Sequence, residues 1–339
     1  MKPLSVKQKA PGYKLTKWVE QNPHGLPTYL GNHQVKRHGV KQPWTIEEIL
    51  EYDKCKNDPS YFAEKYCKVT HVDHGLVDFA LYPYQHKMMR HFNDHRFSIV
   101  LACRQSGKSI SSVVYLLWYA IFHSDKLIAV LANKGSTSRE MLMRITLAFE
   151  NLPFFLQPGA KALNKGSIEF SNGSRIEAHS TSSSSIRGKS CALIYLDEFA
   201  FVERASQFYT STYPVISSGK ETKVIVTSTA NGVGNQFYKL WEGALQGTSQ
   251  FKPFRVDWWD VPGRDEKWKE DTISNTSAEQ FEQEFGNCLE NCSVINIIVD
   301  GIKCDITIGD LYDCFRRKDT SGIPLNEEIR SSSIRWNYD

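Results

Sequence analysis

Residues 102–109 read Ala102-Cys103-Arg104-Gln105-Ser106-Gly107-Lys108-Ser109. The apolar run at 97–101 predicts a buried strand, and residues 110–118 predict the helix that the loop opens. In this context Gly-Lys-Ser is the core of a phosphate-binding loop, or Walker A motif, with Ala102 where the usual pattern has glycine. The order strand, loop, helix predicts an α/β fold that binds a nucleoside triphosphate. The alternative is a chance Gly-Lys-Ser in a βα turn.

Each chemical role in such a loop has one candidate residue. Backbone N–H groups and the N-terminus of the helix would bind phosphates, and Lys108 supplies a positive charge. The Ser109 hydroxyl can bind Mg²⁺. We therefore expect ATP and Mg²⁺ as cofactors. The expected nucleotide-binding residues of the loop are Ala102, Cys103, Arg104, Gln105, Ser106, Gly107, Lys108 and Ser109.

A second motif is the apolar run Ala192-Leu193-Ile194-Tyr195-Leu196, which ends in Asp197-Glu198. Carboxylates at the end of a buried strand are costly unless they face a cleft or a cation. The pattern is typical of a Walker B motif, so we expect Asp197 to bind Mg²⁺ and Glu198 to act on the attacking water. The alternative is a strand that runs out into a solvated acidic turn.

Two further motifs flank these. A β-branched run at 222–229 ends in Thr227-Ser228-Thr229 and predicts another strand. Ligands of open α/β sheets bind at the carboxyl ends of the strands, so these hydroxyl groups can contact the γ-phosphate or its water. Before the first strand, Tyr84 and Gln85 can stack on and hydrogen-bond an adenine ring. They complete the expected nucleotide site.

Together the four motifs resemble the ATPase domain of large terminase subunits from tailed phages of the myovirus type. The resemblance covers roughly residues 44–287 and implies a RecA-like P-loop NTPase sheet with helices on both faces. It implies that Arg104 is an arginine finger acting in cis, and that Lys108 and Glu198 are also catalytic. It further implies that Thr227-Ser228-Thr229 couples hydrolysis to DNA movement. For Arg104, phosphate binding in the ground state is the alternative.

The resemblance implies an ATP-driven motor that translocates double-stranded viral DNA into the procapsid. The expected partners are the DNA, the portal protein, the small terminase subunit and further copies of the chain in a ring. The expected location is the host cytoplasm, transiently at the procapsid portal. Two other functions stay open: a helicase-like or remodelling ATPase, and a non-catalytic portal-binding or truncated precursor module.

Composition fits a folded protein outside the membrane. The chain has 339 residues, 41% of them apolar, and a net charge of +3. No run approaches the roughly 18 consecutive apolar residues of a membrane span, and there is no apolar signal core, so we expect no secretion. The eight cysteines lack paired metal spacing, so we expect reduced thiols.

The sequence predicts five segments. Residues 1–43 hold eight Lys or Arg and one acid, which indicates a basic flexible arm, either functional or simply solvated. Apolar spacing at 44–80 predicts short amphipathic helices that form a lid. The ATPase core is expected at 81–250. A linker subdomain follows at 251–287. Its tryptophans Trp258, Trp259 and Trp268 are expected to fill a small core, and the alternative is a patch that faces DNA.

Residues 288–339 differ in character. Apolar runs at 293–299 and 302–308 around Asp300-Gly301 predict a β-hairpin. With Cys288 before it, this extension resembles the Hint-like N-terminal fragment of a split intein. Cys288 would be the nucleophile that converts the peptide bond after Asn287 into a thioester. The remaining intein motifs and a nuclease domain are not found in 288–339, so we expect a partner chain that carries them and trans-splicing. The alternative is a C-terminal extension that caps the ATPase.

Overall fold

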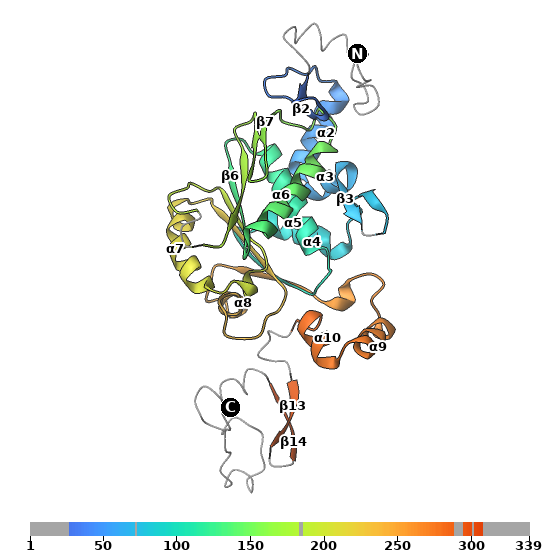
Figure 1. The fold of residues 1–339 in the computed structure, drawn as a ribbon, viewed down its shortest axis with the longest axis vertical. Helices are drawn as coiled ribbons and strands as arrows, with labels where there is room; N and C mark the ends of the chain where they lie inside the picture. The colour runs from blue at the N-terminus through green and yellow to red at the C-terminus, as the bar shows by residue number, and fades with distance from the viewer. Residues whose placement is uncertain (1–26, 72, 183–185, 288–293, 300–301, 308–339) are drawn as a thin grey trace.

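A mixed β-sheet runs through the middle of the molecule in the computed structural model (Figure 1). The structure describes residues 27–71, 73–182, 186–287, 294–299 and 302–307. In these ranges the sheet has eight strands in the order β12-β5-β11-β10-β6-β9-β8-β7. The strands from β12 to β9 pair in parallel, and β8 and β7 each pair antiparallel to their predecessor. The strand bounds are β5 Phe97–Ala102, β6 Leu127–Ala132, β7 Ala160–Leu163, β8 Ser167–Phe170, β9 Arg175–Ser180, β10 Leu193–Leu196, β11 Lys223–Ser228 and β12 Lys252–Val256.

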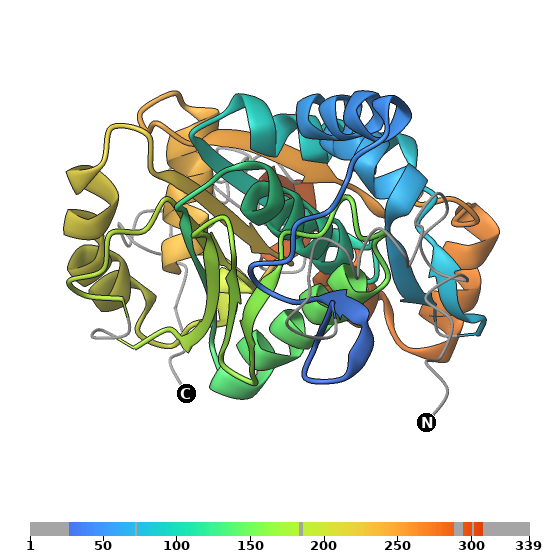
Figure 2. The same cartoon turned by 90° about the horizontal axis from the view of Figure 1, so that it is seen from above.

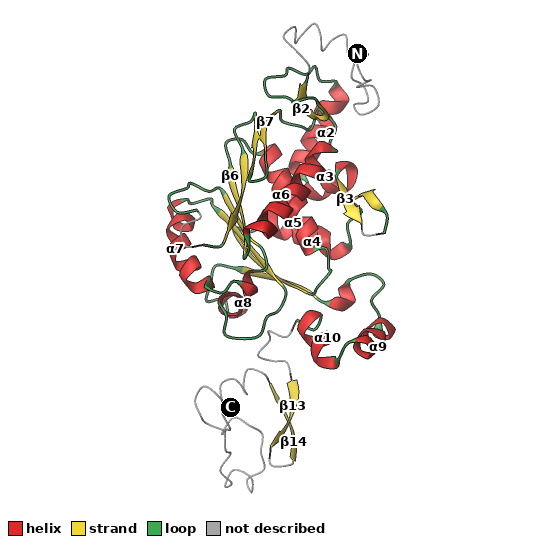
Figure 3. Ribbon diagram, viewed as in Figure 1, coloured by secondary structure: helices red, strands yellow, loops and turns green. Residues whose placement is uncertain are grey.

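Helices cover both faces of the sheet, as the sequence predicts (Figure 3). On one face lie α4 (Pro83–Asp94), α5 (Lys108–Phe122) and α6 (Gly135–Glu150). On the other lie α7 (Ala205–Ser218) and α8 (Gln236–Leu245). A parallel strand covered on both faces buries every side chain, which explains why β5 is apolar throughout apart from Ser98.

Helix α5 follows the phosphate loop and is buried along most of its length. Val113 to Phe122 are all less than 9% exposed, because the helix lies between the sheet and a second layer of helices. That layer includes α2 (Ile46–Asn57) and α3 (Pro59–Tyr66). The Trp118 indole N–H donates to the Cys55 carbonyl oxygen over 2.7 Å. The predicted helices of 44–80 therefore form at α2 and α3 and pack on α5, whereas residues 68–78 form a hairpin that the prediction missed.

Local sequence explains where α2 and α3 begin. Thr45 accepts a hydrogen bond from the Glu48 N–H, and Glu48 accepts one from the Thr45 N–H, which forms a capping box. Asp58 caps α3, where Pro59 occupies the first turn. The small hairpins beside these helices are β1 (Thr28–Tyr29) with β2 (Asn32–Lys36), and β3 (Lys68–His71) with β4 (Gly75–Asp78).

An aromatic cluster forms the core of the segment after β12. This segment contains η3 (Trp258–Asp260), α9 (Glu266–Asn275) and α10 (Ala278–Glu284). Neighbouring rings among Trp258, Trp268, Phe281 and Phe285 lie 5.1–6.0 Å apart, so Trp258 and Trp268 pack in this cluster as predicted. The prediction is wrong for Trp259, which is 58% exposed. Seen from above, α9 and α10 (orange) lie at the opposite end of the molecule from α7 (yellow) (Figure 2).

The predicted hairpin after residue 287 is present in the described residues. β13 (Val294–Val299) pairs antiparallel with β14 (Ile302–Thr307). The expected Asp300-Gly301 turn, Cys288 and most of the basic arm lie outside the described residues. None of the helices in the described ranges has the length and apolar character needed to cross a membrane.

Candidate nucleotide-binding site

The loop between β5 and α5 has the backbone shape of a phosphate cradle. Gly107 has φ +74°, and a Cβ there would lie 2.5 Å from the Gln85 Nε2 atom, so glycine is required. Gln105 also has a positive φ of 55°, which is uncommon for a side chain of its type. The buried Ser106 hydroxyl has no hydrogen-bond partner among the described residues. These features leave polar groups available to a bound anion.

A cavity of about 1510 Å³ opens beside this loop. Its lining includes all of residues 103–110, and Glu198 and Thr229 border it from the neighbouring strand ends. Residues of α6 and of the β3–β4 hairpin form more of the wall. The phosphate loop and Glu198 of the predicted acidic motif therefore face one space.

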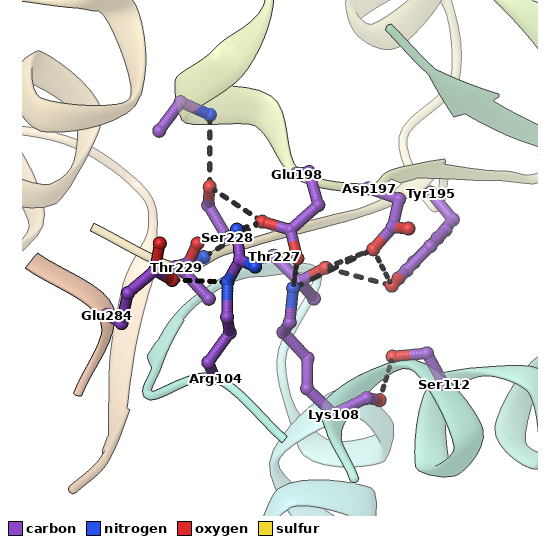
Figure 4. A network of polar contacts seen from close by, with 11 residues as sticks. Arg104, Lys108, Ser112, Tyr195, Asp197, Glu198, Thr227, Ser228, Thr229 and Glu284 are labelled. Atoms are coloured by element: carbon purple, nitrogen blue, oxygen red, sulfur yellow. Dashed lines mark hydrogen bonds and ion pairs between the residues drawn. The ribbon is translucent and has the colours of Figure 1, made fainter. Parts of the chain in front are cut away.

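Lys108 lies between the two acids (Figure 4). Its ammonium group forms an ion pair with the Glu198 carboxylate and lies 3.9 Å from the Asp197 Oδ1 atom. The Lys108 and Asp197 side chains are each 5% exposed. Since a buried charge needs a partner, each group depends on the others.

Glu198 is held in an unusual conformation at the end of β10. Its φ is +46°, in the left-handed region. The Oε2 atom accepts a hydrogen bond from the Thr229 N–H at 3.0 Å and lies within reach of the Ser228 and Thr229 hydroxyls. Burial opposes ionisation, but the Lys108 ammonium and the Thr229 hydrogen bonds lower the pKa of Glu198 overall. Glu198 is thus an oriented carboxylate.

Asp197 is fixed from the other side by two hydroxyl groups. Tyr195 donates to Asp197 Oδ1 at 2.9 Å and Thr227 at 3.2 Å, and the two hydroxyls are 2.8 Å apart. Burial raises the pKa of Asp197, although the Lys108 ammonium opposes this shift. Tyr195 was missed in the sequence. Its position two residues before Asp197, on the same face of the strand, is the signal that would have indicated it.

The comparison with protein families decides the classification. Residues 99–291 match the family described as "Terminase large subunit, T4likevirus-type, N-terminal", more than half of the 339 residues. The chain belongs to this family.

Solved terminase structures share the fold at low sequence identity. The Thermus phage P74-26 large terminase ATPase domain matches with a TM-score of 0.51 and 17% identity, over 62% of this chain and 94% of that one. The large terminase of bacteriophage HK97 matches with a TM-score of 0.57 and 16% identity, over 72% and 57%. The large terminase of a thermophilic bacteriophage, in complex with ADP, matches with 0.51 and 13%, over 63% and 55%. The chain thus spans little more than half the length of the last two terminases.

Arg104, the loop arginine of this terminase domain, is paired with the segment after β12. Its guanidinium forms an ion pair with Glu284 of α10, and its backbone N–H donates to the Glu284 carbonyl oxygen at 3.0 Å (Figure 4). The Arg104 side chain is 56% exposed. Glu284 was not predicted, because nothing in the local sequence around it indicates a phosphate-loop partner.

Tyr84 and Gln85 lie under the loop. The Tyr84 hydroxyl donates to the Ser106 carbonyl oxygen at 2.6 Å, and its ring is 7% exposed. Gln85 accepts from the Tyr82 N–H at 2.8 Å while its amide nitrogen approaches Gly107. Tyr82, which is 42% exposed and lines the cavity, was not predicted. Both predicted residues thus support the loop, and Tyr82 adds an exposed ring.

The predicted ligands of a divalent cation are the side-chain oxygen atoms of Ser109 and Asp197. Ser109 lines the cavity at the start of α5, and Asp197 follows β10 at the same edge of the sheet. Hydroxyl and carboxylate oxygens are the ligands that Mg²⁺ prefers, so these residues fit the ion.

The first residues of the loop are attached to the sheet. Ala102 ends β5, and the Cys103 N–H donates to the Val256 carbonyl oxygen at 3.0 Å. Burial raises the pKa of Cys103 to about 11, so this thiol is protonated at neutral pH.

The predicted intein nucleophile, Cys288, is outside the described residues.

Proposed function

We propose that this terminase domain is an ATPase that drives translocation of double-stranded viral DNA into the procapsid. The observation that carries the proposal is the juxtaposition of Lys108, Asp197 and Glu198 beside a phosphate-loop backbone. Membership of the large terminase family supports the packaging role. The ADP complex of the thermophilic phage terminase, which shares the fold, supports nucleotide binding.

In the proposed reaction, the N–H groups of the loop and Lys108 bind the phosphates. Phosphate oxygens compete with Glu198 for the Lys108 ammonium, which releases the carboxylate to accept a proton from the attacking water. Hydrogen bonds from Thr229 keep that carboxylate oriented. Glu198 is therefore the proposed general base.

Four residues form the proposed metal site: two would bind the ion, and two would orient the Asp197 carboxylate. Mg²⁺, when bound, neutralises part of the phosphate charge, and Ser109 and Asp197 would be its protein ligands. Tyr195 and Thr227 fix the Asp197 carboxylate in position. Their hydroxyls thus act through Asp197.

We further propose that Arg104 leaves Glu284 to stabilise charge on the γ-phosphate. A guanidinium is permanently charged and suits phosphate oxygens. The Thr227-Ser228-Thr229 segment contacts both Asp197 and Glu198 at the end of β11. Loss of the γ-phosphate would therefore change the contacts of β11 and so couple hydrolysis to DNA movement. Tyr82 and Gln85 are the proposed contacts of the adenine ring, with Tyr84 supporting the loop.

The remaining partners follow from the family role. They are the portal protein, the small terminase subunit and further copies of the chain in a ring on the procapsid, in the host cytoplasm. A stand-alone helicase-like ATPase would instead hydrolyse ATP and separate strands without a portal.

The decisive experiment compares Glu198→Gln with the unchanged protein. We expect Glu198→Gln to bind ATP normally and to lose hydrolysis, because glutamine has a similar shape but cannot accept the proton. Glu242→Gln, at a partly exposed position on α8, is the matched control. Undiminished hydrolysis by Glu198→Gln would reject the assignment.

For residues 288–339 we propose an N-terminal split-intein fragment with Cys288 as nucleophile. Two observations support it: the family match ends at residue 291, four residues after the proposed junction, and a hairpin follows at β13 and β14. Mass spectrometry of the native protein should find Asn287 joined to residues that this chain does not encode. A peptide that continues from Asn287 into Cys288-Leu289 would reject this proposal.

A further inference from the structure

Arg264 connects the segment after β12 to the phosphate loop. Its Nη1 atom donates to the Cys103 sulfur at 3.5 Å and to the Arg104 carbonyl oxygen at 3.0 Å. Its Nη2 atom donates to the Gln105 carbonyl oxygen at 3.2 Å. One guanidinium thus contacts three consecutive residues of the loop, although it lies about 160 positions later in the chain.

The same guanidinium packs against two aromatic rings. Its central carbon lies 4.7 Å from the Trp268 ring centroid and 5.2 Å from that of Phe285. Those two rings pack edge to face at 5.1 Å. Stacking on two rings restricts the orientation of the guanidinium plane. The position of Arg264 at the loop therefore depends on where α9 and the end of α10 place these rings.

Peptide geometry explains what these hydrogen bonds accomplish. In a planar trans peptide, the carbonyl of one residue and the N–H of the next point in opposite directions. By holding the Arg104 and Gln105 carbonyls, Arg264 therefore fixes the directions of the Gln105 and Ser106 N–H groups. The positive φ of Gln105, which its side chain disfavours, makes this restraint necessary.

We propose that Arg264 is a positioning residue that aims the loop N–H groups at the nucleotide phosphates. Through it, the placement of the segment 257–287 sets nucleotide affinity. The inference rests on the proposed function only in that nucleotide binds at residues 102–109. Arg264 itself need not touch the nucleotide.

The test measures ADP binding and the KM and kcat of ATP hydrolysis in Arg264→Ala, Arg264→Lys and the unchanged protein. We expect the Kd for ADP and the KM for ATP to rise about tenfold in Arg264→Ala, as the loss of charged hydrogen bonds predicts. The kcat should change much less, because Lys108 and Glu198 are untouched. Arg264→Lys should show a similar loss, since an ammonium cannot form the same forked contacts while stacked.

Lys269→Ala is the matched control. Lys269 lies over the Trp258 and Phe281 rings of the same aromatic cluster, at 5.5 and 6.0 Å, and does not line the cavity. It should leave both the Kd and the KM unchanged. Thermal unfolding without nucleotide checks that each variant is folded. If Arg264→Ala does not fold, the comparison of Arg264→Lys with the unchanged protein tests the inference.

The possible outcomes distinguish failure of this inference from failure of the proposed ATPase function. Binding within twofold of the unchanged protein in a folded Arg264→Ala variant would overturn the inference. Full recovery in Arg264→Lys would overturn it too, because charge alone would then suffice. If the unchanged protein binds no ADP, the proposed function itself fails.

Discussion

The Lys108 ammonium lies against the Glu198 carboxylate, so the phosphate loop and the end of β10 are joined by an ion pair. Lys108 also lies 3.9 Å from Asp197. One cation therefore balances the buried Asp197 and the partly exposed Glu198, and any phosphate that attracts it changes the environment of both. Nucleotide binding and the readiness of Glu198 to accept a proton are linked through this contact.

Lys108→Ala should weaken ATP binding by at least about tenfold, because a charged phosphate contact is worth about 1.5–3 kcal/mol. It should also raise the pKa of Glu198, since the ammonium is one of the groups that lower it. Titration calorimetry with ATP measures the first effect. Lys239→Ala, on the exposed side of α8, serves as control, and unchanged affinity in Lys108→Ala would contradict the assignment.

Glu284→Gln should tighten ATP binding by a factor of about two to five. The change frees Arg104 from an ion pair whose side chains are 56% and 31% exposed, and such pairs are worth about 0–1 kcal/mol. The backbone hydrogen bond from Arg104 to the residue 284 carbonyl remains. In an Arg104→Ala background the same change should have no effect on the Kd. Equal effects in both backgrounds would show that Arg104 is not the group released.

Tyr195→Phe should lower the free energy of unfolding by about 1–2 kcal/mol, because buried hydrogen bonds to Asp197 and Thr227 are lost. The concentration of Mg²⁺ needed for half-maximal ATPase should also rise, since Asp197 loses one of the groups that orient it. Urea unfolding and a Mg²⁺ titration measure the two effects. Tyr209→Phe removes a hydroxyl from α7, away from the site, and should leave the Mg²⁺ requirement unchanged.

His91 predicts a stability change in mild acid. Burial lowers the pKa of His91 to about 4, against about 6.5 when unfolded, and its Nε2–H donates to the Lys252 carbonyl at 3.0 Å. Between these values the unfolded chain binds more protons, so stability falls as pH decreases from about 6.5 to about 4. His91→Gln should show a smaller decrease. Urea unfolding at several pH values tests this, and parallel curves for the two proteins would contradict it.

The parts of the site that lie within one strand–loop unit could be predicted from the sequence. Residues 97–118, Asp197-Glu198 and Thr227-Ser228-Thr229 each carry a local pattern, and the structure brings these three together at one edge of the sheet. Periodicity likewise predicted helices within residues 44–80, and these form at Ile46–Asn57 and Pro59–Tyr66.

The contacts that cross the chain could not be predicted in this way. Glu284 and Arg264 meet the phosphate loop only because β12 lies beside β5, and strand order is not encoded in local periodicity. Tyr84 has the residue type expected of an adenine contact, but burial under the loop depends on how α4 packs. Such features require the three-dimensional structure.

The position of β5 in the sheet has a consequence for synthesis on the ribosome. β5 leads into the phosphate loop, yet it lies between β11 and β12, where Phe97 pairs with Val224 and Ala102 with Val256. The buried strand β5 and the apolar helix α5 are therefore synthesised long before either strand that pairs with β5. Pairings so distant in sequence form slowly, and the waiting segment is prone to aggregate. The phosphate loop is thus synthesised early, but it reaches its folded position only after β11 and β12 have been made.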